Sequence, residues 1–375
     1  MKIFNLDFSI PKKSSIGILD YPGSILIKKI LKDNTIQLIS TRKMKINIFV
    51  LFLSFFQNYK FQIGQRYIIS FIKVVKPKIL ISHIDNNNFF YTLKKIFPEI
   101  KFIFIQNGIS LASYSPNDFK MLKWKTDYFF SYSESFSKKY KCIFKIDNIK
   151  TIGSLKNNYK KVEKKKKNQI VYISQFFKDD QFNKKINIEN KIFLRSSFFK
   201  AEKLLLPILY EFCLKKNLKL IIAGRNKIPT SHEEEKFYLN ILKKYENNLN
   251  SFIFKKLNND FSSYSLVDSA KLVVFIDSAL GYQSLARGNK SFACCLRSQF
   301  LKSKNLKFGW PSNFKHEGPF WINSYNKKKI INKLEFLYSL SLSEWKNMYK
   351  RNKKKLLTFE LGNQSFIDTI KKLKK

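Results

Sequence analysis

Residues 272–292 read LVVFIDSALGYQSLARGNKSF, an apolar strand that gives way at once to a helix. The strand ends in Asp277 and Ser278, and Gly288 closes the helix before a second apolar run at 290–295. A strand, a helix and another strand in this order are typical of a parallel sheet, whose neighbouring strands need a crossover connection. The stretch therefore predicts an α/β fold.

The junction between this strand and this helix is suited to an anion, because the first N–H groups of a helix are free and its N-terminus is positive. Ser278 can cap the helix or donate to a phosphate oxygen, and Gly281 permits close approach of a ligand. Gln283 follows in the same turn and is expected to face the same mouth. We predict a phosphate site here, with an ordinary helix cap by Asp277 or Ser278 as the alternative.

The same alternation runs through the whole chain and restarts after a charged segment. Residues 156–167 read KNNYKKVEKKKK, which is typical of a solvated linker. We predict an N-terminal Rossmann-like domain at 1–155, the linker at 156–168, a C-terminal Rossmann-like domain at 169–344 and a helical segment at 345–375. Two doubly wound parallel sheets would face a cleft, with ligands beyond the carboxyl ends of their strands.

Polar residues that follow apolar strands are therefore the candidate site residues. In the C-terminal half, Gly224 and Arg225 follow the strand at 218–223, and Arg225 can place a guanidinium over a phosphate. In the N-terminal half, His83 and Asp85 follow the strand at 78–82, and Asp85 can act as a catalytic base. A surface Arg and plain turn chemistry remain the alternatives.

Two further segments are expected to line the cleft. KFIFIQNG, at 101–108, is a strand that runs into Gln106, Asn107 and Gly108, which suit a hydroxyl-rich ligand. FGWPSNFKHEGPFW, at 308–321, is too apolar for a plain linker and carries His316 and Glu317. We predict that it folds over the cleft, with packing by its own aromatic rings as the alternative.

The chain has 375 residues and a formal net charge of +44, which at first suggests nucleic acid or an anionic membrane as a partner. Of the 71 basic residues, 64 are Lys and seven are Arg, whereas base readout and phosphate clamps favour Arg. Lys, Asn, Ile, Phe and Tyr are all residues of A/T-rich codons. We interpret most of the charge as compositional drift and predict no nucleic-acid partner.

The cysteines indicate a reducing compartment, and the apolar runs indicate a chain without a membrane span. Cys142, Cys213, Cys294 and Cys295 lack metal-ligand spacing, and the last two lie in a run that reads as a buried strand. The N-terminus has no signal-peptide core, and the most apolar run, residues 46–56, is shorter than the ~20 residues of a bilayer span. We predict a cytoplasmic protein, with peripheral membrane contact left open.

The quoted segments, with DYFFSYSES and TIGSLKNN at 127–135 and 151–158, resemble the surface-carbohydrate biosynthesis proteins, glycosyltransferase-like enzymes of the GT-B fold involved in capsule and lipopolysaccharide synthesis. The resemblance covers residues 15–345 and is most specific at DSALGYQSLARG. It implies that Ser278, Gly281 and Arg225 face the phosphates of a nucleotide-sugar donor. Relatives tend to carry Glu where this chain has Gln283, which can still hydrogen-bond a donor hydroxyl but cannot act as a base.

We therefore predict a glycosyltransferase that moves a sugar from a nucleotide-activated donor to a surface-polysaccharide or lipid-linked acceptor. No D-x-D, Walker A, G-x-S-x-G or H-E-x-x-H element is evident, so neither a metal nor another cofactor is expected. Two alternatives on the same fold are a polyol-phosphate transferase and a nucleotide-sugar epimerase. A third, from another class, is a non-enzymatic Lys-rich binder of anionic surfaces or nucleic acid.

Overall fold

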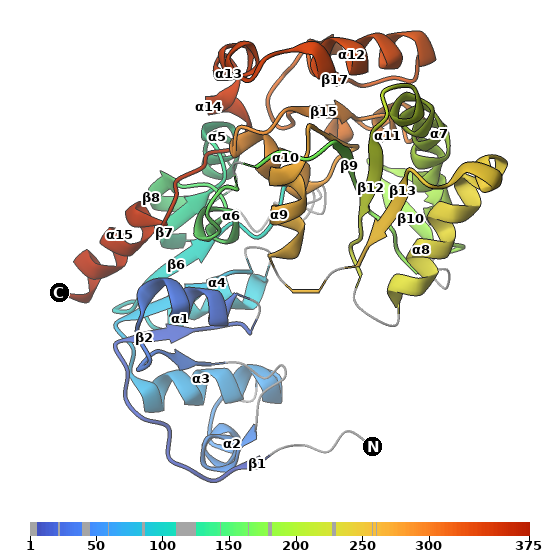
Figure 1. The fold of residues 1–375 in the computed structure, drawn as a ribbon. Coiled ribbons are helices and arrows are strands. Elements are labelled where there is room, and N and C mark those ends of the chain that lie inside the picture. The colour runs from blue at the N-terminus through green and yellow to red at the C-terminus, as the bar shows by residue number, and fades with distance from the viewer. Residues whose placement is uncertain are drawn as a thin grey trace. The chain divides into compact units, whose positions relative to one another are not determined.

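The computed structural model describes residues 6–21, 23–39, 46–58, 60–84, 87–109, 125–142, 144–163, 165–178, 182–226, 230–256, 258–259 and 261–375. The chain divides into two compact units (Figure 1). Unit 1 comprises Met1–Tyr159 and Glu360–Lys375, and unit 2 comprises Lys160–Phe359.

Unit 1 is built on a six-stranded, wholly parallel sheet in the order β3-β2-β5-β6-β7-β8. Its strands are β2 (Ile16–Ile18), β3 (Gln37–Leu38), β5 (Ile79–Ser82), β6 (Lys101–Ile105), β7 (Lys125–Ser131) and β8 (Lys145–Thr151). Its helices are α1 (Ser24–Leu31), α2 (Ile48–Phe55), α3 (Ile63–Val75), α4 (Asn88–Ile96), α5 (Glu134–Lys141), α6 (Leu155–Tyr159) and α15 (Gln364–Lys374). A separate parallel pair joins β1 (Leu6–Asp7) to β4 (Ile46–Asn47).

The strands of this sheet form because their residues are apolar on both faces. Every residue of β5 is buried, as are the last four of β6, which is the pattern of a parallel sheet covered by helices on both sides. The chain moves outward from β2 to β3 and then returns to place β5 on the other side of β2. The strand order thus reverses between β2 and β5, which makes this the topological switch point of unit 1.

The last helix of the chain, α15, belongs to unit 1 rather than to unit 2. Phe366 and Ile370 lie in the core beside the central strands, and the Phe366 ring is 5.2 Å from that of Phe130 on β7. The predicted helical segment at 345–375 is therefore divided between the units, because only α15 presents an apolar face to the unit 1 core.

Unit 2 has a seven-stranded sheet in the order β13-β12-β9-β14-β15-β17-β16, parallel except for β16. Its strands are β9 (Gln169–Ile173), β12 (Lys219–Ala223), β13 (Phe252–Lys255), β14 (Leu272–Phe275), β15 (Ser291–Cys294), β16 (Glu317–Gly318) and β17 (Trp321–Ile322). The hairpin of β10 (Lys185–Ile188) and β11 (Lys191–Leu194) stands apart from this sheet. The chain runs from β9 to β12 and β13, then crosses to β14, so the switch point lies between β9 and β14.

The helices of unit 2 pack on this sheet in pairs, with α7 and α12 together over β12 and β15, and α9 and α10 together beside β14 and β15. They are α7 (Lys200–Lys215), α8 (Thr230–Ile241), α9 (Ser262–Ser269), α10 (Ala279–Ala286), α11 (Arg297–Phe300), α12 (Lys327–Ser339), α13 (Leu342–Lys350) and α14 (Lys353–Leu356). Cys294 and Cys295, read as a buried strand from the sequence, are fully buried at the end of β15.

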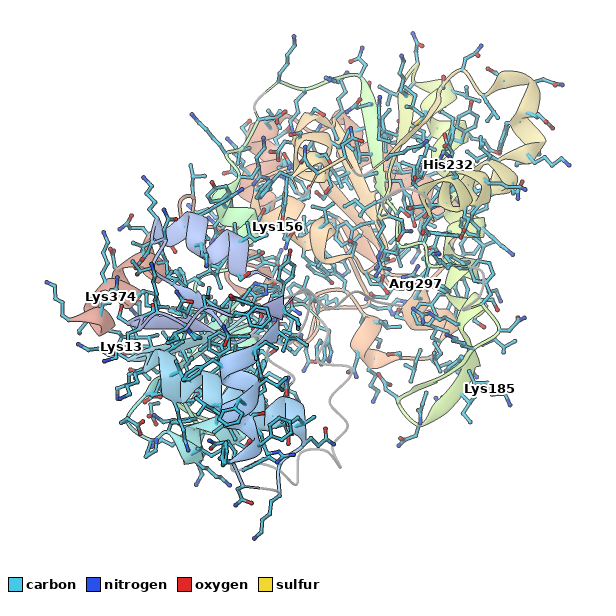
Figure 2. All side chains as sticks on the ribbon, turned by 90° about the horizontal axis from the view of Figure 1, so that it is seen from below. Lys13, Lys156, Lys185, His232, Arg297 and Lys374 are labelled. Atoms are coloured by element: carbon cyan, nitrogen blue, oxygen red, sulfur yellow. The ribbon has the colours of Figure 1, made fainter. Side chains whose placement is uncertain are left out.

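The two α/β sheets confirm the predicted fold class. The predicted linker at 156–168 is not solvated throughout, because its first residues form α6, where Asn157 and Asn158 are buried. Labelled lysines such as Lys185 and Lys374 point outward from the chain, whereas Arg297 lies inside unit 2 (Figure 2). None of the helices in the described part of the chain is long and apolar enough to cross a membrane.

Candidate functional site

Three polar residues meet at the switch point of unit 1. Asp20 follows β2, and Ser82 and His83 come at the end of the neighbouring strand β5. The Ser82 hydroxyl donates to Asp20 Oδ2 at 2.9 Å, and the His83 backbone N–H donates to the same oxygen at 2.8 Å. Because ligands of open α/β sheets bind at such a point, this cluster is the candidate site of unit 1.

The Asp20 carboxyl group is buried, yet one of its oxygens is left without a partner. Oδ2 accepts the two hydrogen bonds from Ser82 and His83, whereas Oδ1 has no partner among the described residues. Burial raises the pKa of Asp20 to about 6, although the hydrogen bonds from His83 and Ser82 oppose this shift. A carboxyl group with a pKa in this range, and a free oxygen, can exchange a proton near neutral pH.

The His83 ring lies against the turn that begins helix α1. Gly23 takes the left-handed backbone conformation there, with φ +86°, and a Cβ on it would come within 2.9 Å of the His83 ring. Burial lowers the pKa of His83 to about 4, despite a hydrogen bond with the Asn107 side chain that favours the charged form. The ring is therefore neutral at pH 7, and its buried Nδ1 has no partner among the residues described.

The turn after β6 brings the next predicted residues to the same edge of the sheet. Gln106 is fully buried: its Oε1 accepts from the Tyr132 backbone N–H at 2.8 Å, and its Nε2 donates to the Gly108 carbonyl at 2.6 Å. Gln106 thus shapes the turn, and Asn107 is exposed and reaches the His83 ring. Asp85, the predicted base, lies outside the described residues, and its role stays a prediction.

In unit 2, a buried guanidinium fills the switch point. Arg297, at the start of α11, donates through Nη1 to Gln175 Oε1 at 2.9 Å and to Asp277 Oδ1 at 2.8 Å. It also forms an ion pair with the fully buried Glu202 of α7 and donates through Nε to the Phe198 carbonyl. Gln175 follows β9 and Asp277 follows β14, so Arg297 ties together the two strand ends on either side of the switch point.

The charge of Arg297 is fixed by its neighbours. Burial alone would lower the pKa of Arg297, but the carboxylates of Asp277 and Glu202 outweigh that effect and raise the pKa instead. Asp277 is consequently held by Arg297, and of the two predicted caps it is Ser278 that takes the N-cap position of α10. Two nearby atoms, Glu202 Oε2 and the Tyr172 hydroxyl, are buried without a partner in the described structure.

A buried carboxylate holds the turn after β12 through hydrogen bonds to its backbone. Glu234 of α8 accepts hydrogen bonds from the backbone N–H groups of Arg225 and Asn226, at 2.9 and 3.0 Å, and from the Ser174 hydroxyl. Ser174 follows β9, so this turn is linked to the same strand end as Arg297. The backbone amides of the turn are occupied, and the exposed Arg225 side chain is the group left to meet a ligand.

The N-terminus of α10 lies at this edge, and no side chain of the described residues caps it. Ser278 is the N-cap by its backbone conformation, but its hydroxyl makes no capping hydrogen bond, which leaves it available for a ligand. The glycine at position 281 is required for packing and not, as expected, for the approach of a ligand. A Cβ there would overlap the Phe275 ring of β14, so this glycine permits the helix to pack closely on the strand.

Three other predicted residues lie farther from the switch point or face elsewhere. Gln283 is buried and accepts from the Tyr264 hydroxyl at 2.8 Å, so its carbonyl does not face the mouth. His316 is exposed beside β16, where its Nε2 lies 2.9 Å from Ser324 Oγ. Glu317 pairs with Lys329 at 3.1 Å, and that hydrogen bond lowers its pKa.

The segment at 308–321 packs through its own aromatic rings. The Phe308 and Trp321 rings stack 4.8 Å apart, and Phe314 and Phe320 contact Trp321 edge-on. Trp321 and the following Ile322 form β17 inside the sheet, and Glu317 and Gly318 form the edge strand β16. This agrees with the alternative given above, in which the segment is packed by its own rings.

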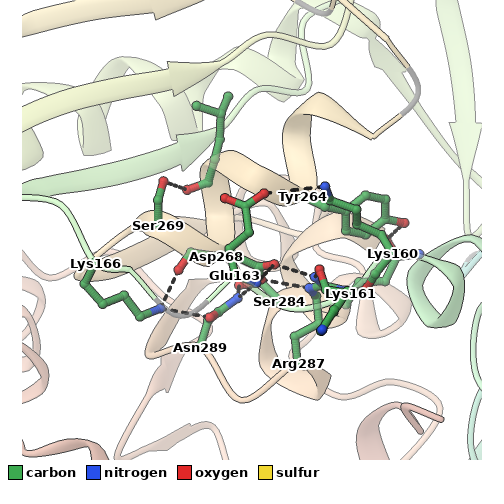
Figure 3. Close-up of polar contacts among 12 residues, drawn as sticks. Lys160, Lys161, Glu163, Lys166, Tyr264, Asp268, Ser269, Ser284, Arg287 and Asn289 are labelled. Carbon is green, nitrogen blue, oxygen red and sulfur yellow. Dashed lines mark hydrogen bonds and ion pairs between the residues drawn. The ribbon is translucent and has the colours of Figure 1, made fainter. Parts of the chain in front are cut away.

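Arg287, the arginine of the DSALGYQSLARG element, is structural (Figure 3). Its Nε donates to Asp268 Oδ1 at 2.8 Å, and its Nη atoms donate to the carbonyls of Lys160 and Lys161 at 2.9 and 3.0 Å. Lys166 donates to the Asp268 carbonyl at 2.7 Å. These contacts fasten the Lys-rich segment onto unit 2, so Arg287 holds the start of this unit instead of a ligand.

Sequence reasoning missed two residues that the structure places at the switch points, Asp20 and Arg297. Asp20 carries the signal used elsewhere, a polar residue directly after an apolar strand, but the Pro22-Gly23 pair that follows it is also typical of a plain turn. Arg297 follows the buried strand that ends at Cys294 and is one of only seven arginines in the chain. Both residues follow an apolar strand, so the pattern used for the other candidate residues also predicts them as candidates.

The fold is that of the GT-B enzymes. The structure is similar to the wall teichoic acid polymerase TagF, with a TM-score of 0.55 and 13% identity over 97% of this chain and 89% of that chain. It is also similar to the UDP-GlcNAc 2-epimerase of Neisseria meningitidis, with 0.55 and 11% over 96% and 99%. The sucrose-phosphate synthase of Thermosynechococcus elongatus gives 0.53 and 10% over 96% and 98%. At these identities the likeness shows the fold alone.

The sequence places the chain in a particular family within this class. Residues 103–374 match the family described as "putative O-antigen biosynthesis protein". The match spans more than half of the chain, and the protein belongs to this family. No curated protein shows significant similarity to the sequence. The resemblance to surface-carbohydrate biosynthesis proteins is thereby confirmed.

Proposed function

We propose that the protein is a glycosyltransferase that moves a sugar from a nucleotide-activated donor to a glycan or lipid-linked acceptor during the synthesis of a surface polysaccharide. Membership of the O-antigen biosynthesis family and the GT-B fold support the class of reaction. The observation that carries the proposal is the pair of polar clusters at the two switch points, one centred on a buried arginine and one with a titratable carboxyl group.

In this proposal, unit 2 binds the donor. The uncapped N-terminus of α10, the free Ser278 hydroxyl and the exposed Arg225 guanidinium supply N–H and O–H donors to the nucleotide phosphates. Arg297 does not touch the donor; it fixes Asp277 and Gln175, so that the donor-binding groups are positioned before the substrate arrives. The leaving-group charge is met by these groups without a metal ion.

Unit 1 supplies the base. As the acceptor hydroxyl attacks the anomeric carbon, its proton passes to Asp20 Oδ1, and the bond between that carbon and the phosphate oxygen breaks. The nucleotide leaves with the bonding electron pair, stabilised by the donors of unit 2. His83 is neutral at pH 7 and is suited to hydrogen-bond a sugar hydroxyl through its unpartnered Nδ1.

Two other reactions on the same fold are favoured by the named neighbours. The similarity to UDP-GlcNAc 2-epimerases, two of them bound to UDP-GlcNAc, supports an epimerase. The similarity to a wall teichoic acid polymerase supports transfer of a polyol phosphate. Analysis of the products separates the three reactions. Glycosyl transfer lengthens the acceptor glycan, epimerisation does not attach the sugar to an acceptor, and phosphotransfer adds a phosphate group to the acceptor.

A thermal-shift panel of nucleotide sugars tests the proposal. One donor is expected to raise the melting temperature, and Arg225→Ala is expected to remove most of that rise. Arg351→Ala, which removes an exposed arginine elsewhere in unit 2, is the matched control and should leave the rise intact. Absence of a shift with every donor would refute donor binding, and addition of EDTA should change nothing if no metal takes part.

A further inference from the structure

Helix α2 (Ile48–Phe55) exposes large apolar side chains to solvent, which a surface helix normally buries. Its exposed positions are Phe49, Phe52 and Phe55, and Phe56 follows directly after its end, with 38%, 59%, 52% and 71% of each side chain exposed. The spacing of three and four residues places these rings along one face. The fully buried positions are Val50 and Ser54, so the small side chains face inward and the large aromatic ones face solvent.

This orientation is fixed by specific contacts. The Asn47 side chain caps the helix by accepting from the Val50 N–H at 3.0 Å, and the Asn47 backbone N–H donates to the Tyr67 hydroxyl of α3 at 3.0 Å. The Ser54 hydroxyl donates to the Leu51 carbonyl at 2.6 Å, which satisfies it inside the packed face. The helix therefore cannot rotate its phenylalanines inward without breaking both anchors to Asn47.

A second apolar segment lies beside this helix, as Figure 1 shows for β1 and α2. Asn47 Nδ2 donates to the Ser9 carbonyl at 2.6 Å, which ties residues 6–10 to the start of α2. Within that segment Leu6, Phe8 and Ile10 are exposed. We call these three residues and the four phenylalanines the aromatic face. Exposed apolar side chains on two segments joined in this way mark an interaction site.

The sequence that carries the aromatic face is strongly basic. Residues 34–84 contain eight Lys or Arg and no Asp or Glu. Lys73 Nζ donates to Gln57 Oε1 at 2.8 Å, which brings an ammonium group close to the end of α2, and Lys60 is exposed nearby in sequence. Asp7, the one acid among residues 1–19, accepts hydrogen bonds from Ser9.

We propose that the aromatic face docks unit 1 on a lipid bilayer that carries anionic headgroups. Phenylalanine side chains insert at the boundary of headgroups and acyl chains, and lysines around them meet lipid phosphates. A second copy of the chain fits less well, because an isologous contact would set these lysines against their own equivalents without acids to pair with. α2 has eight residues and lies on the membrane instead of spanning it.

Co-sedimentation with vesicles tests this proposal with the full chain and no donor, so its outcome is independent of the transfer reaction. The protein is expected to bind vesicles of phosphatidylcholine and phosphatidylglycerol in equal parts, and to bind phosphatidylcholine alone at least about tenfold more weakly. High salt should release only the electrostatic part of the binding.

The variant Phe52→Ser/Phe56→Ser is expected to lower partitioning into the mixed vesicles by about tenfold or more, because each ring loses its buried apolar area. The matched control is Phe336→Ser/Ile192→Ser, which removes two exposed apolar side chains from unit 2 and should bind like the wild type. All four positions are exposed, and equal melting temperatures would verify that both variants fold.

Two outcomes would overturn the proposal. One is vesicle binding that is unchanged in the α2 variant, or lowered equally by the control. The other is a wild-type dimer in analytical ultracentrifugation that Phe52→Ser/Phe56→Ser dissociates, which would assign the aromatic face to contact between copies. Quenching of a Phe52→Trp variant by brominated lipid, with Phe336→Trp unquenched, would support insertion at α2 directly.

Discussion

The switch points of the two units are alike in topology and opposite in chemistry. In unit 2, the edge between β9 and β14 is occupied by Arg297, which is bonded to Asp277, Gln175 and Glu202. In unit 1, the edge between β2 and β5 holds Asp20 and His83, each with a buried polar atom that has no partner among the described residues. The first arrangement fixes two strand ends in place, and the second leaves two polar atoms without a partner.

The difference shows how one fold is adapted to two roles. A buried ion pair is costly to break and so holds strand ends in one geometry. Asp20, by contrast, has no cationic partner among the described residues, and a buried carboxyl group whose pKa is raised to about 6 is a candidate for proton transfer. If this contrast is correct, substitutions in unit 2 should mainly change stability and donor affinity, and substitutions in unit 1 should mainly change the rate.

The largest effect is expected from Asp20→Asn. Loss of a general base lowers the transfer rate by about 10²–10⁴-fold, and the wild-type rate should rise with pH up to the Asp20 pKa of about 6. The rate is measured as nucleotide release from the donor found in the thermal-shift panel. Asp33→Asn is the control, since Asp33 pairs with Lys374 and should leave the rate unchanged. A full rate in Asp20→Asn would exclude Asp20 as the base.

Arg297→Met tests the opposite role in unit 2. It leaves Glu202 buried without its partner, and we expect the free energy of unfolding to fall by about 3–5 kcal/mol. Urea denaturation measures this loss. Arg351→Met, an exposed position, should stay within about 0.5 kcal/mol of the wild type. Equal stability of the two variants would mean that Arg297 does not hold the strand ends.

The pH dependence of stability separates Asp20 from His83. Asp20 has a raised pKa of about 6, so its contribution to the free energy of unfolding falls as pH rises from about 4 to 6. His83 has a lowered pKa of about 4, so its contribution to the free energy of unfolding falls as pH drops from about 6.5 to 4. The two slopes oppose each other in the wild type. Denaturation between pH 4 and 6.5 should show stability rising with pH in Asp20→Asn and falling with pH in His83→Gln, each on the order of 2–3 kcal/mol. Parallel slopes in the two variants would contradict this assignment.

Gly23→Ala and Gly288→Ala form a matched pair, because both glycines have φ +86°. Each alanine should cost about 1–2 kcal/mol for the left-handed backbone. At Gly23 the new Cβ also displaces the His83 ring, whereas at Gly288 it meets nothing within 4 Å. We therefore expect similar melting temperatures for the pair but a lower rate for Gly23→Ala alone. A common rate in both variants would show that the position of His83 is unimportant.

The smallest change in stability is expected from Arg225→Ala. Arg225 is exposed, so the free energy of unfolding should change by less than about 0.5 kcal/mol. Loss of a charge-assisted hydrogen bond to phosphate should weaken donor binding by about ten- to a hundredfold, measured by titration calorimetry. If Arg225→Ala lowered the stability without weakening donor binding, Arg225 would have a structural role in unit 2 and no role in the donor site.

Part of the fold and part of the candidate site could be predicted from the sequence. The apolar runs that form β5, β6, β12 and β14 are predicted within a residue or two, because buried parallel strands are apolar throughout. The hairpin of β10 and β11, whose residues are mostly exposed, has no such signal. The cluster of Asp20 with Ser82 and His83 has no local signal, because these partners lie more than 60 residues away from it.

The sequence by itself determined the parallel α/β class, the polar strand ends and the excess of lysine over arginine, because these depend on local pattern and composition. Only the tertiary structure decided which polar residues act together. Gln283 faces a tyrosine, Gly281 makes room for Phe275, and Arg287 fastens the linker, although all three lie in one short element. It also decided that the phenylalanines of α2 face outward, since the direction of a helix face depends on what packs against it.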